Sequence, residues 1–182
     1  AALAAPTAAF ADETGDWVPD FDQAIEIAKR DGKDLLVDFT GSDWCGWCIK
    51  LHDEVFSKEA FLTSAKGEYV LVALDFPNGE EAKAKVPHPD RNAELAQKYG
   101  IQGYPTILLV TADGDVYGRT GYQAGGPESY VKHLAELREK GRAPALEAAK
   151  TVAAIAAAEG DAKKTLIEGA IAALAGLEDG AA

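Results

Sequence analysis

The sequence has few of the residues that metal sites and nucleic-acid interfaces need. It contains two cysteines, three histidines and no methionine among 182 residues. These leave little material for a site with several metal ligands, so we expect no bound metal. Eighteen basic residues against 30 acidic ones give a net charge of −12, and the basic residues are scattered. A nucleic acid is therefore not an expected partner.

Long apolar runs are also missing. No stretch of 18 apolar residues occurs, so we expect no membrane span. The lack of an initiator methionine indicates a trimmed start, and Ala9, Phe10 and Ala11 have the small-x-small pattern of a signal-peptidase site. We expect residues 1–11 to be the remnant of an export signal and the protein to be periplasmic or extracellular. A flexible alanine-rich leader is the alternative.

Both cysteines lie in one short segment, Trp44-Cys45-Gly46-Trp47-Cys48. An apolar run at 35–39 precedes it and an amphipathic stretch at 47–55 follows. This order predicts a strand that delivers the pair to the first turn of a helix. Free N–H groups and the helix dipole stabilise a thiolate there. We expect Cys45, the more exposed cysteine, to attack a disulfide and Cys48 to resolve the mixed disulfide.

Other uses of the pair are weaker alternatives. A structural bridge across so short a loop constrains little of the unfolded chain. A structural zinc site needs four ligands, which Cys45, Cys48, His52 and His88 could supply only by accident. Haem attachment needs a histidine directly after the second cysteine, where Ile49 stands. We therefore expect a redox-active disulfide and no other cofactor.

The apolar pattern predicts alternating strands and helices. Strands are expected at 16–18, 35–40, 69–75, 105–110 and 116–119, and helices at 21–31, 46–56, 57–61, 90–99 and 127–141, with a loop at 76–89. Two of the strands are apolar on both faces and are joined through helices, which implies parallel pairing. The last two strands form a hairpin. We predict an α/β domain over residues 12–141, with a sheet of four to five strands flanked by helices.

The composition changes after Gly141. The sequence Arg142-Ala143-Pro144 predicts a joint, and residues 142–182 are rich in good helix formers. We predict a C-terminal extension that forms a helical hairpin, with helices at 144–159 and 161–177. Its apolar stripe comprises Leu166, Ile167, Ala170, Ile171, Leu174 and Leu177. The hairpin is expected to pack on the main domain or on a second copy in a homo-oligomer; a partner-binding surface is the alternative.

With these elements placed, the chain resembles the thioredoxin superfamily from about residue 16 to 141, and its exported thioredoxin-like members in particular. The motifs are the strand that runs into the cysteine pair, Gly103-Tyr104-Pro105-Thr106 before a strand, Asp113-Gly114 in the hairpin, and Gly121-Tyr122 before the last helix. The resemblance implies a thioredoxin-like fold with a mixed sheet, and a cis peptide bond before Pro105.

Several residues depart from the family pattern. Trp47 stands where thioredoxins usually carry proline, and the link from Thr40 to Asp43 is one residue longer than usual. The helix after Cys48 lacks the usual kink proline, and the strand at 69–75 has no lysine. These differences bear on the redox potential and on proton transfer.

Asp38 is a carboxylate in an otherwise apolar strand. Burial without a partner raises the pKa of such a group, which suits a base that takes the proton of Cys48 through water. The alternative is an aspartate that hydrogen-bonds a backbone loop. Pro105 lacks an N–H and is expected to present a flat surface beside the sulfurs, while Thr106 offers its backbone to a substrate strand.

The expected substrate-binding residues surround the cysteine pair: Trp44, Gly46, Trp47, Tyr104, Pro105 and Thr106. The two tryptophans are expected to form an apolar rim, with Trp47 exposed; alternatively, Trp44 only covers the core. We expect a thiol–disulfide oxidoreductase that acts on protein or peptide thiols and disulfides, as a reductase or isomerase, with an unidentified redox partner. The alternative is a non-catalytic binding or assembly module that uses the helical tail, and a weaker third is metal handling by Cys45, Cys48 and His52.

Overall fold

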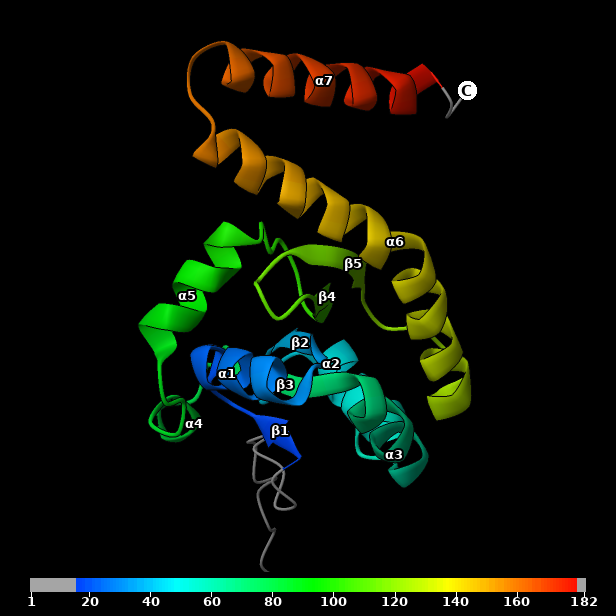
Figure 1. Ribbon diagram of the computed structural model, residues 1–182. Coiled ribbons are helices and arrows are strands. Elements are labelled where there is room, and N and C mark those ends of the chain that lie inside the picture. The colour runs from blue at the N-terminus through cyan, green and yellow to red at the C-terminus, as the bar shows by residue number, and fades with distance from the viewer. Residues whose placement is uncertain (1–15, 180–182) are drawn as a thin grey trace, which may run out of the picture.

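A five-stranded mixed sheet forms the centre of the computed structural model, which describes residues 16–179 and side chains up to 173 (Figure 1). The strand order is β1-β3-β2-β4-β5. β1, β2 and β3 are parallel, whereas β4 runs antiparallel to β2 and to β5. The strands are β1 (Trp17–Val18), β2 (Asp34–Thr40), β3 (Tyr69–Asp75), β4 (Thr106–Val110) and β5 (Val116–Thr120). The predicted mixed sheet is thus confirmed.

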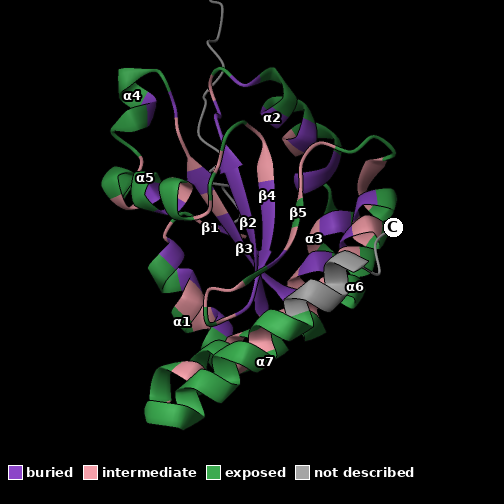
Figure 2. Ribbon diagram, turned by 90° about the horizontal axis from the view of Figure 1, so that it is seen from above, coloured by how far each residue is buried: buried purple, intermediate pink, exposed green. Residues whose placement is uncertain are grey.

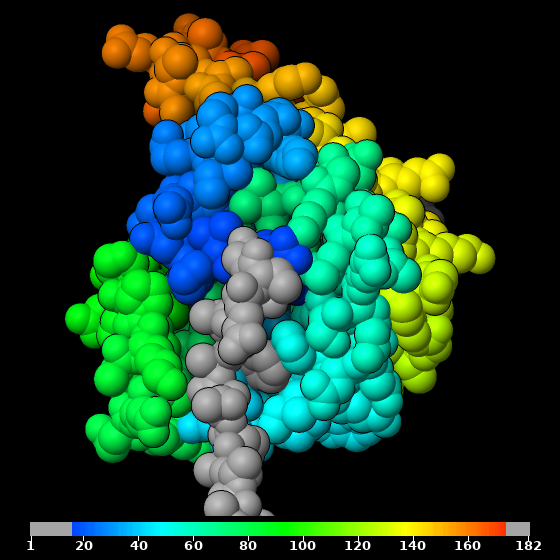
Figure 3. All heavy atoms as spheres, turned by 90° about the horizontal axis from the view of Figure 1, so that it is seen from below, coloured from blue at the N-terminus to red at the C-terminus, as the bar shows by residue number. Residues whose placement is uncertain are grey.

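Helices cover both faces of this sheet. They are α1 (Phe21–Asp31), α2 (Gly46–Leu51), the π-helix η1 (His52–Phe56), α3 (Glu59–Glu68), α4 (Glu80–Lys83), α5 (Pro89–Lys98), α6 (Gly126–Ala157) and α7 (Gly160–Asp179). α1 and α5 pack on one face, and α2, η1, α3 and α6 pack on the other. From below, α5 and the first half of α6 lie on opposite sides of the molecule (Figure 3). The predicted order is confirmed, although α4 lies within the predicted loop.

The central strand β2 is buried along its whole length (Figure 2). Leu35, Val37 and Phe39 face α1 and α5, whereas Leu36 faces the helices of the other layer. Because side chains alternate along a strand, Asp34, Asp38 and Thr40 share the face of Leu36. Three polar side chains therefore lie on the side of β2 that α2 and α6 cover.

A π-helix takes the place of the missing kink proline. After Leu51 the helical hydrogen bonds change from the i to i−4 pattern to the wider i to i−5 pattern. The N–H of Ser57, for example, donates to the carbonyl of His52 at 2.9 Å. A π turn holds one extra residue and shifts the side chains that follow it. Val55 and Phe56 are thereby both buried in the core.

The predicted joint at residues 142–144 is wrong, because α6 runs without a break from Gly126 to Ala157. Proline removes one helical hydrogen bond and usually ends a helix. Here contacts fix the helix on both sides of Pro144. Arg142 bonds the buried Asp34 at 2.6 Å, and Ala145 packs against the core. The predicted boundary between residues 141 and 142 therefore falls inside a helix.

The last helix, α7, contacts α6 (Figure 1). Its described apolar side chains remain largely exposed, with Ile171 at 61% (Figure 2). The side chains of Leu174 and Leu177, and the predicted export remnant at 1–11, lie outside the described residues. Within those residues, no helix combines the length and apolarity of a membrane span.

Close packing of α6 on β5 predicts the effect of a single methyl group. A Cβ at Gly141 would lie 1.9 Å from the carbonyl oxygen of Tyr117, which is backbone and cannot swing aside. Gly141→Ala should lower the free energy of unfolding by about 2 kcal/mol or more, measured by urea denaturation. Gly169→Ala on α7 meets no atom within 4 Å and should raise it by about 0.5 kcal/mol. Equal effects of the two variants would contradict this account.

Candidate active site

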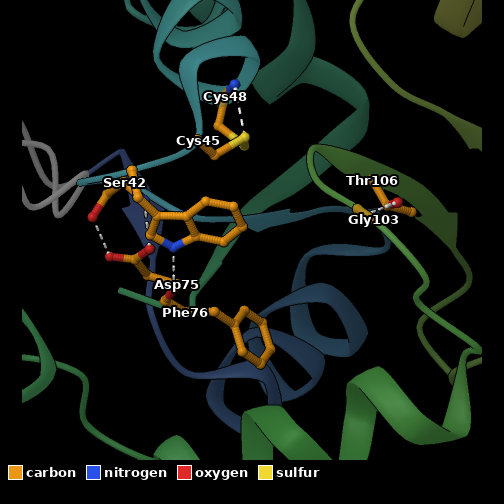
Figure 4. Close-up of a disulfide and its surroundings, with 8 residues drawn as sticks. Ser42, Cys45, Cys48, Asp75, Phe76, Gly103 and Thr106 are labelled. Carbon is orange, nitrogen blue, oxygen red and sulfur yellow. Dashed lines mark hydrogen bonds between the residues drawn. A yellow bond between two sulfur atoms is a disulfide. The ribbon is translucent and has the colours of Figure 1, made fainter. Parts of the chain in front are cut away.

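The two cysteines form a disulfide where α2 begins (Figure 4). Cys45 is the N-cap of α2, and its Sγ accepts a hydrogen bond from the N–H of Cys48 at 3.2 Å. The same N–H would face a Cys45 thiolate after reduction and stabilise it. Both residues are buried, Cys45 at 6% exposure and Cys48 at 3%. The predicted difference in exposure is therefore small.

Trp44 packs tightly on the turn that leads from β2 to the cysteines. Its Nε1 donates to the carbonyl of Phe76 at 2.8 Å. A Cβ at Gly41 would lie 2.5 Å from the indole ring, so this position needs glycine. Trp44 is nevertheless 46% exposed, which leaves part of its ring at the surface beside the disulfide.

Two carboxylates hold the link from Thr40 to Asp43, which is one residue longer than usual in the family. Asp43 accepts hydrogen bonds from the backbone N–H groups of Asn78 and Gly79, at 2.9 and 2.6 Å, and these bonds lower its pKa. Asp75 accepts from the N–H and the hydroxyl of Ser42, at 2.9 and 2.5 Å (Figure 4). No sequence pattern indicates these pairings, because the partners are more than 30 residues apart.

The Tyr104–Pro105 peptide bond is cis, as the family resemblance implied. The ring of Tyr104 lies 5.7 Å from that of Trp44, which brings the proline turn beside the cysteine turn. Thr106 begins β4, opposite Phe39 of β2, and its hydroxyl donates to the carbonyl of Gly103 at 2.7 Å (Figure 4). The segment after the turn is thus fixed to the central strand.

Trp47 is 57% exposed, as predicted, and belongs to a cluster that sequence analysis missed. Its ring centroid lies 5.0 Å from that of Tyr122. The ammonium group of Lys50 lies 5.2 Å from the Trp47 ring and 5.0 Å from the Tyr122 ring. The Tyr122 hydroxyl donates to Glu54 at 2.6 Å. The cluster connects the helix after the cysteines to the loop before α6. In the sequence, only the i, i+4 spacing of Lys50 and Glu54 indicates part of this cluster.

Asp38 is 8% exposed, and its Oδ1 has no hydrogen-bond partner. Burial, and secondarily the charge of Asp75, raises the pKa of Asp38 well above its usual value. The pKa of Tyr130 in α6 is raised mainly by burial and further by the negative charge of Asp38. A carboxyl group with a raised pKa is a candidate proton acceptor.

A sequence model of the thioredoxin-like domain matches residues 21–138. The chain belongs to the thioredoxin-like family. The matched residues include the cysteine pair, Asp38 and the cis proline. The family model therefore covers the segments that meet at the disulfide.

Individual members of the family are also similar to this chain. It is 35% identical to disulfide bond reductase DsbH of Chlamydia pneumoniae over 62% of this chain and 66% of that protein. It is 28% identical to the thioredoxin-related protein DsbJ of the same organism, over 52% of this chain and 27% of that one. A solved structure of DsbH oxidoreductase superposes with a TM-score of 0.58 at 31% identity, over 68% of this chain and 83% of that chain. The chain thus spans less than two thirds of the length of the two curated relatives.

The burial of Asp38 predicts a pH-dependent stability. An aspartate in the unfolded chain has a pKa of about 3.9. Because the folded value is raised, the folded state binds the proton more tightly, and stability falls as pH rises from about 4 to the folded pKa. Asp38→Asn should therefore be more stable than wild type above this window, by about 1.4 kcal/mol for each pH unit that separates the folded from the unfolded pKa of Asp38. The difference should vanish below about pH 4.

Urea denaturation across this pH range measures the effect. Asp113→Asn, at a carboxylate that is 77% exposed, serves as the matched control and should follow the wild-type curve. Parallel curves for wild type and Asp38→Asn would show that Asp38 does not titrate abnormally.

Proposed function

We propose that this protein is a thiol–disulfide oxidoreductase that acts on protein disulfides through a cycle of Cys45 and Cys48. One observation carries the proposal: the disulfide lies at the start of α2, next to the turn that contains cis-Pro105. A bridge that closes so short a loop adds little to stability, whereas this location suits exchange with another disulfide.

In the reducing direction, the Cys45 thiolate attacks one sulfur of a substrate disulfide. A bond forms between Cys45 and that sulfur, and the other substrate sulfur leaves as a thiolate. Cys48 then gives its proton to Asp38 and attacks Cys45 Sγ. The Cys45–Cys48 bond re-forms, and the second substrate sulfur leaves. The substrate has gained two electrons, which an external redox partner must restore to the protein.

We favour the reductase or isomerase direction. The curated relative DsbH, which is 35% identical, is described as a disulfide bond reductase. A solved structure that is 31% identical to this chain also bears the name oxidoreductase. Disulfide exchange suits an exported protein, because disulfides persist in oxidising compartments. Export is thus part of the proposal, and the small-x-small pattern of Ala9, Phe10 and Ala11 supports it.

The cysteine roles predict different outcomes for two matched variants. Cys45→Ser should reduce the rate of insulin-disulfide reduction by more than about 100-fold, because it removes the nucleophile. Cys48→Ser should also lose turnover but accumulate a mixed disulfide with substrate, visible by mass spectrometry and released by dithiothreitol. Insulin reduction that continues unchanged in Cys45→Ser would refute the proposal. A different outcome, no reductase activity in the wild type and partner capture that is equal with both cysteines replaced, would point to a binding module that keeps the fold without the chemistry.

The exposed aromatic cluster predicts how substrate is held. Removing the Trp47 ring, or the Tyr122 ring that supports it, should raise KM for insulin by about threefold to tenfold, the worth of an aromatic contact. Rates with a small aromatic disulfide, which needs no extended docking surface, should change by less than about twofold. The variants are Trp47→Ala and Tyr122→Leu.

Val152→Ala is the control for this prediction, because Val152 is an apolar side chain of α6 that is 66% exposed and far along the chain from the cysteines. It should leave both reactions unchanged. If Trp47→Ala slows the small and the large substrate equally, the ring affects the chemistry of the cysteines and not docking.

A further inference from the structure

Two buried polar atoms on one face of β2 have no hydrogen-bond partner: Asp38 Oδ1 and Thr40 Oγ1. The two residues are 8% and 1% exposed. They are two apart in a strand, so their side chains point to the same side, toward the layer that contains α2. Buried polar groups without partners are rare in native proteins, and an enclosed water that joins them is the usual explanation.

The spacing of the two residues suits such a water. The Cα atoms of residues i and i+2 of a strand are about 6.6 Å apart, and Asp38 Oδ1 and Thr40 Oγ1 do not bond each other directly. Side chains on adjacent same-face positions can be joined by two consecutive hydrogen bonds through one water molecule. A threonine hydroxyl can donate to this water, and the water can then donate to a carboxylate.

The neighbouring strand places a second carboxylate at the end of this row. In the parallel register, Thr40 lies opposite Asp75 and Asp38 lies opposite Ala73. Asp75 is half-buried and accepts two hydrogen bonds from Ser42. Its negative charge opposes ionisation of Asp38, whereas a donated hydrogen bond would favour it. A water held by Thr40 would therefore act on the ionisation of Asp38 in the direction opposite to Asp75.

We propose that Thr40 is a positioning residue for the exchange reaction: its hydroxyl holds a water molecule against Asp38, and this water readies the carboxylate to take the proton of Cys48. The inference rests on the proposed thiol–disulfide exchange. In the step concerned, the Cys48 thiol proton moves to the Asp38 carboxylate. The Cys48 thiolate attacks Cys45 Sγ, the Cys45–Cys48 bond forms, and the bond from Cys45 to the substrate sulfur breaks.

The step can be isolated with the small disulfide 5,5′-dithiobis(2-nitrobenzoate) and the full-length reduced protein. Attack by Cys45 releases one coloured thiolate, and closure by Cys48 releases the second. The pH dependence of the second phase reports the ionisation of Asp38 and Cys48, and carbon-13 NMR of the Asp38 carboxyl group reports Asp38 directly. Neither readout requires activity on protein disulfides, so failure of the proposed function would be seen separately.

Thr40→Val should move the pH midpoint of closure upward. A shift of about one pH unit makes closure about tenfold slower below the midpoint, while the rates converge at high pH. Thr40→Ser retains the hydroxyl and should restore the wild-type profile. Asp75→Asn should move the midpoint downward, because a neighbouring negative charge is removed. Thr40→Ala, measured in parallel, gives the same test if the valine variant fails to fold.

Three controls separate this role from a loss of stability and from other nearby titrating groups. Thr111→Val replaces another buried threonine, near the β4–β5 turn, and should leave the closure profile unchanged. The profiles are repeated with His52→Gln, because His52 lies one turn after Cys48, and with Tyr130→Phe, because Tyr130 faces Asp38 from α6. An unchanged midpoint in Thr40→Val, or an equal shift in Thr40→Ser, would overturn the proposal.

Discussion

The burial of β2 on both faces is the constraint on which the rest of the structure depends. The strand pairs with β3 on one side and with β4 on the other, and all seven of its residues are buried. Its end at Thr40 fixes where the cysteine turn starts. Its pairing of Phe39 with Thr106 fixes the segment that follows cis-Pro105. One strand thus brings together two segments that lie about 60 residues apart in sequence.

Much of this arrangement could be predicted because it depends on local chemistry. Apolar residues on both faces identify β2 and β3 as central strands. Asp20 caps α1, and Gly32 ends it with a positive φ, as residue preferences predict. The cysteine pair, its place at the start of a helix and the proline turn follow from short motifs of specific spacing. At each of these positions the local preference agrees with the tertiary structure.

The remaining features could not be predicted because long-range contacts decide them. Proline inside a helix is unfavourable locally, yet α6 continues past Pro144 because Arg142 is fixed to Asp34, 108 residues earlier. The hydrogen bonds of Ser42 with Asp75 likewise join residues 33 apart. No periodic pattern in the sequence encodes such pairs. The π-helix η1 that follows α2 is a related case, since no residue in the sequence signals it.

Asp34 and Asp38 lie on the same face of the same strand and are similarly buried, yet their surroundings differ. Asp34, 2% exposed, is bonded by Arg138, Arg142 and the Tyr117 hydroxyl, at 2.5, 2.6 and 2.9 Å. A buried carboxylate held by two cations serves to fasten α6 to the sheet. Asp38 has an unpartnered oxygen and a carboxylate, Asp75, as its charged neighbour. Burying an unpaired carboxylate is unfavourable, and the same face of β2 shows that this fold can pair one. The surroundings of Asp38 therefore support the proton transfer that we propose for the cysteine pair, and those of Asp34 do not suit it.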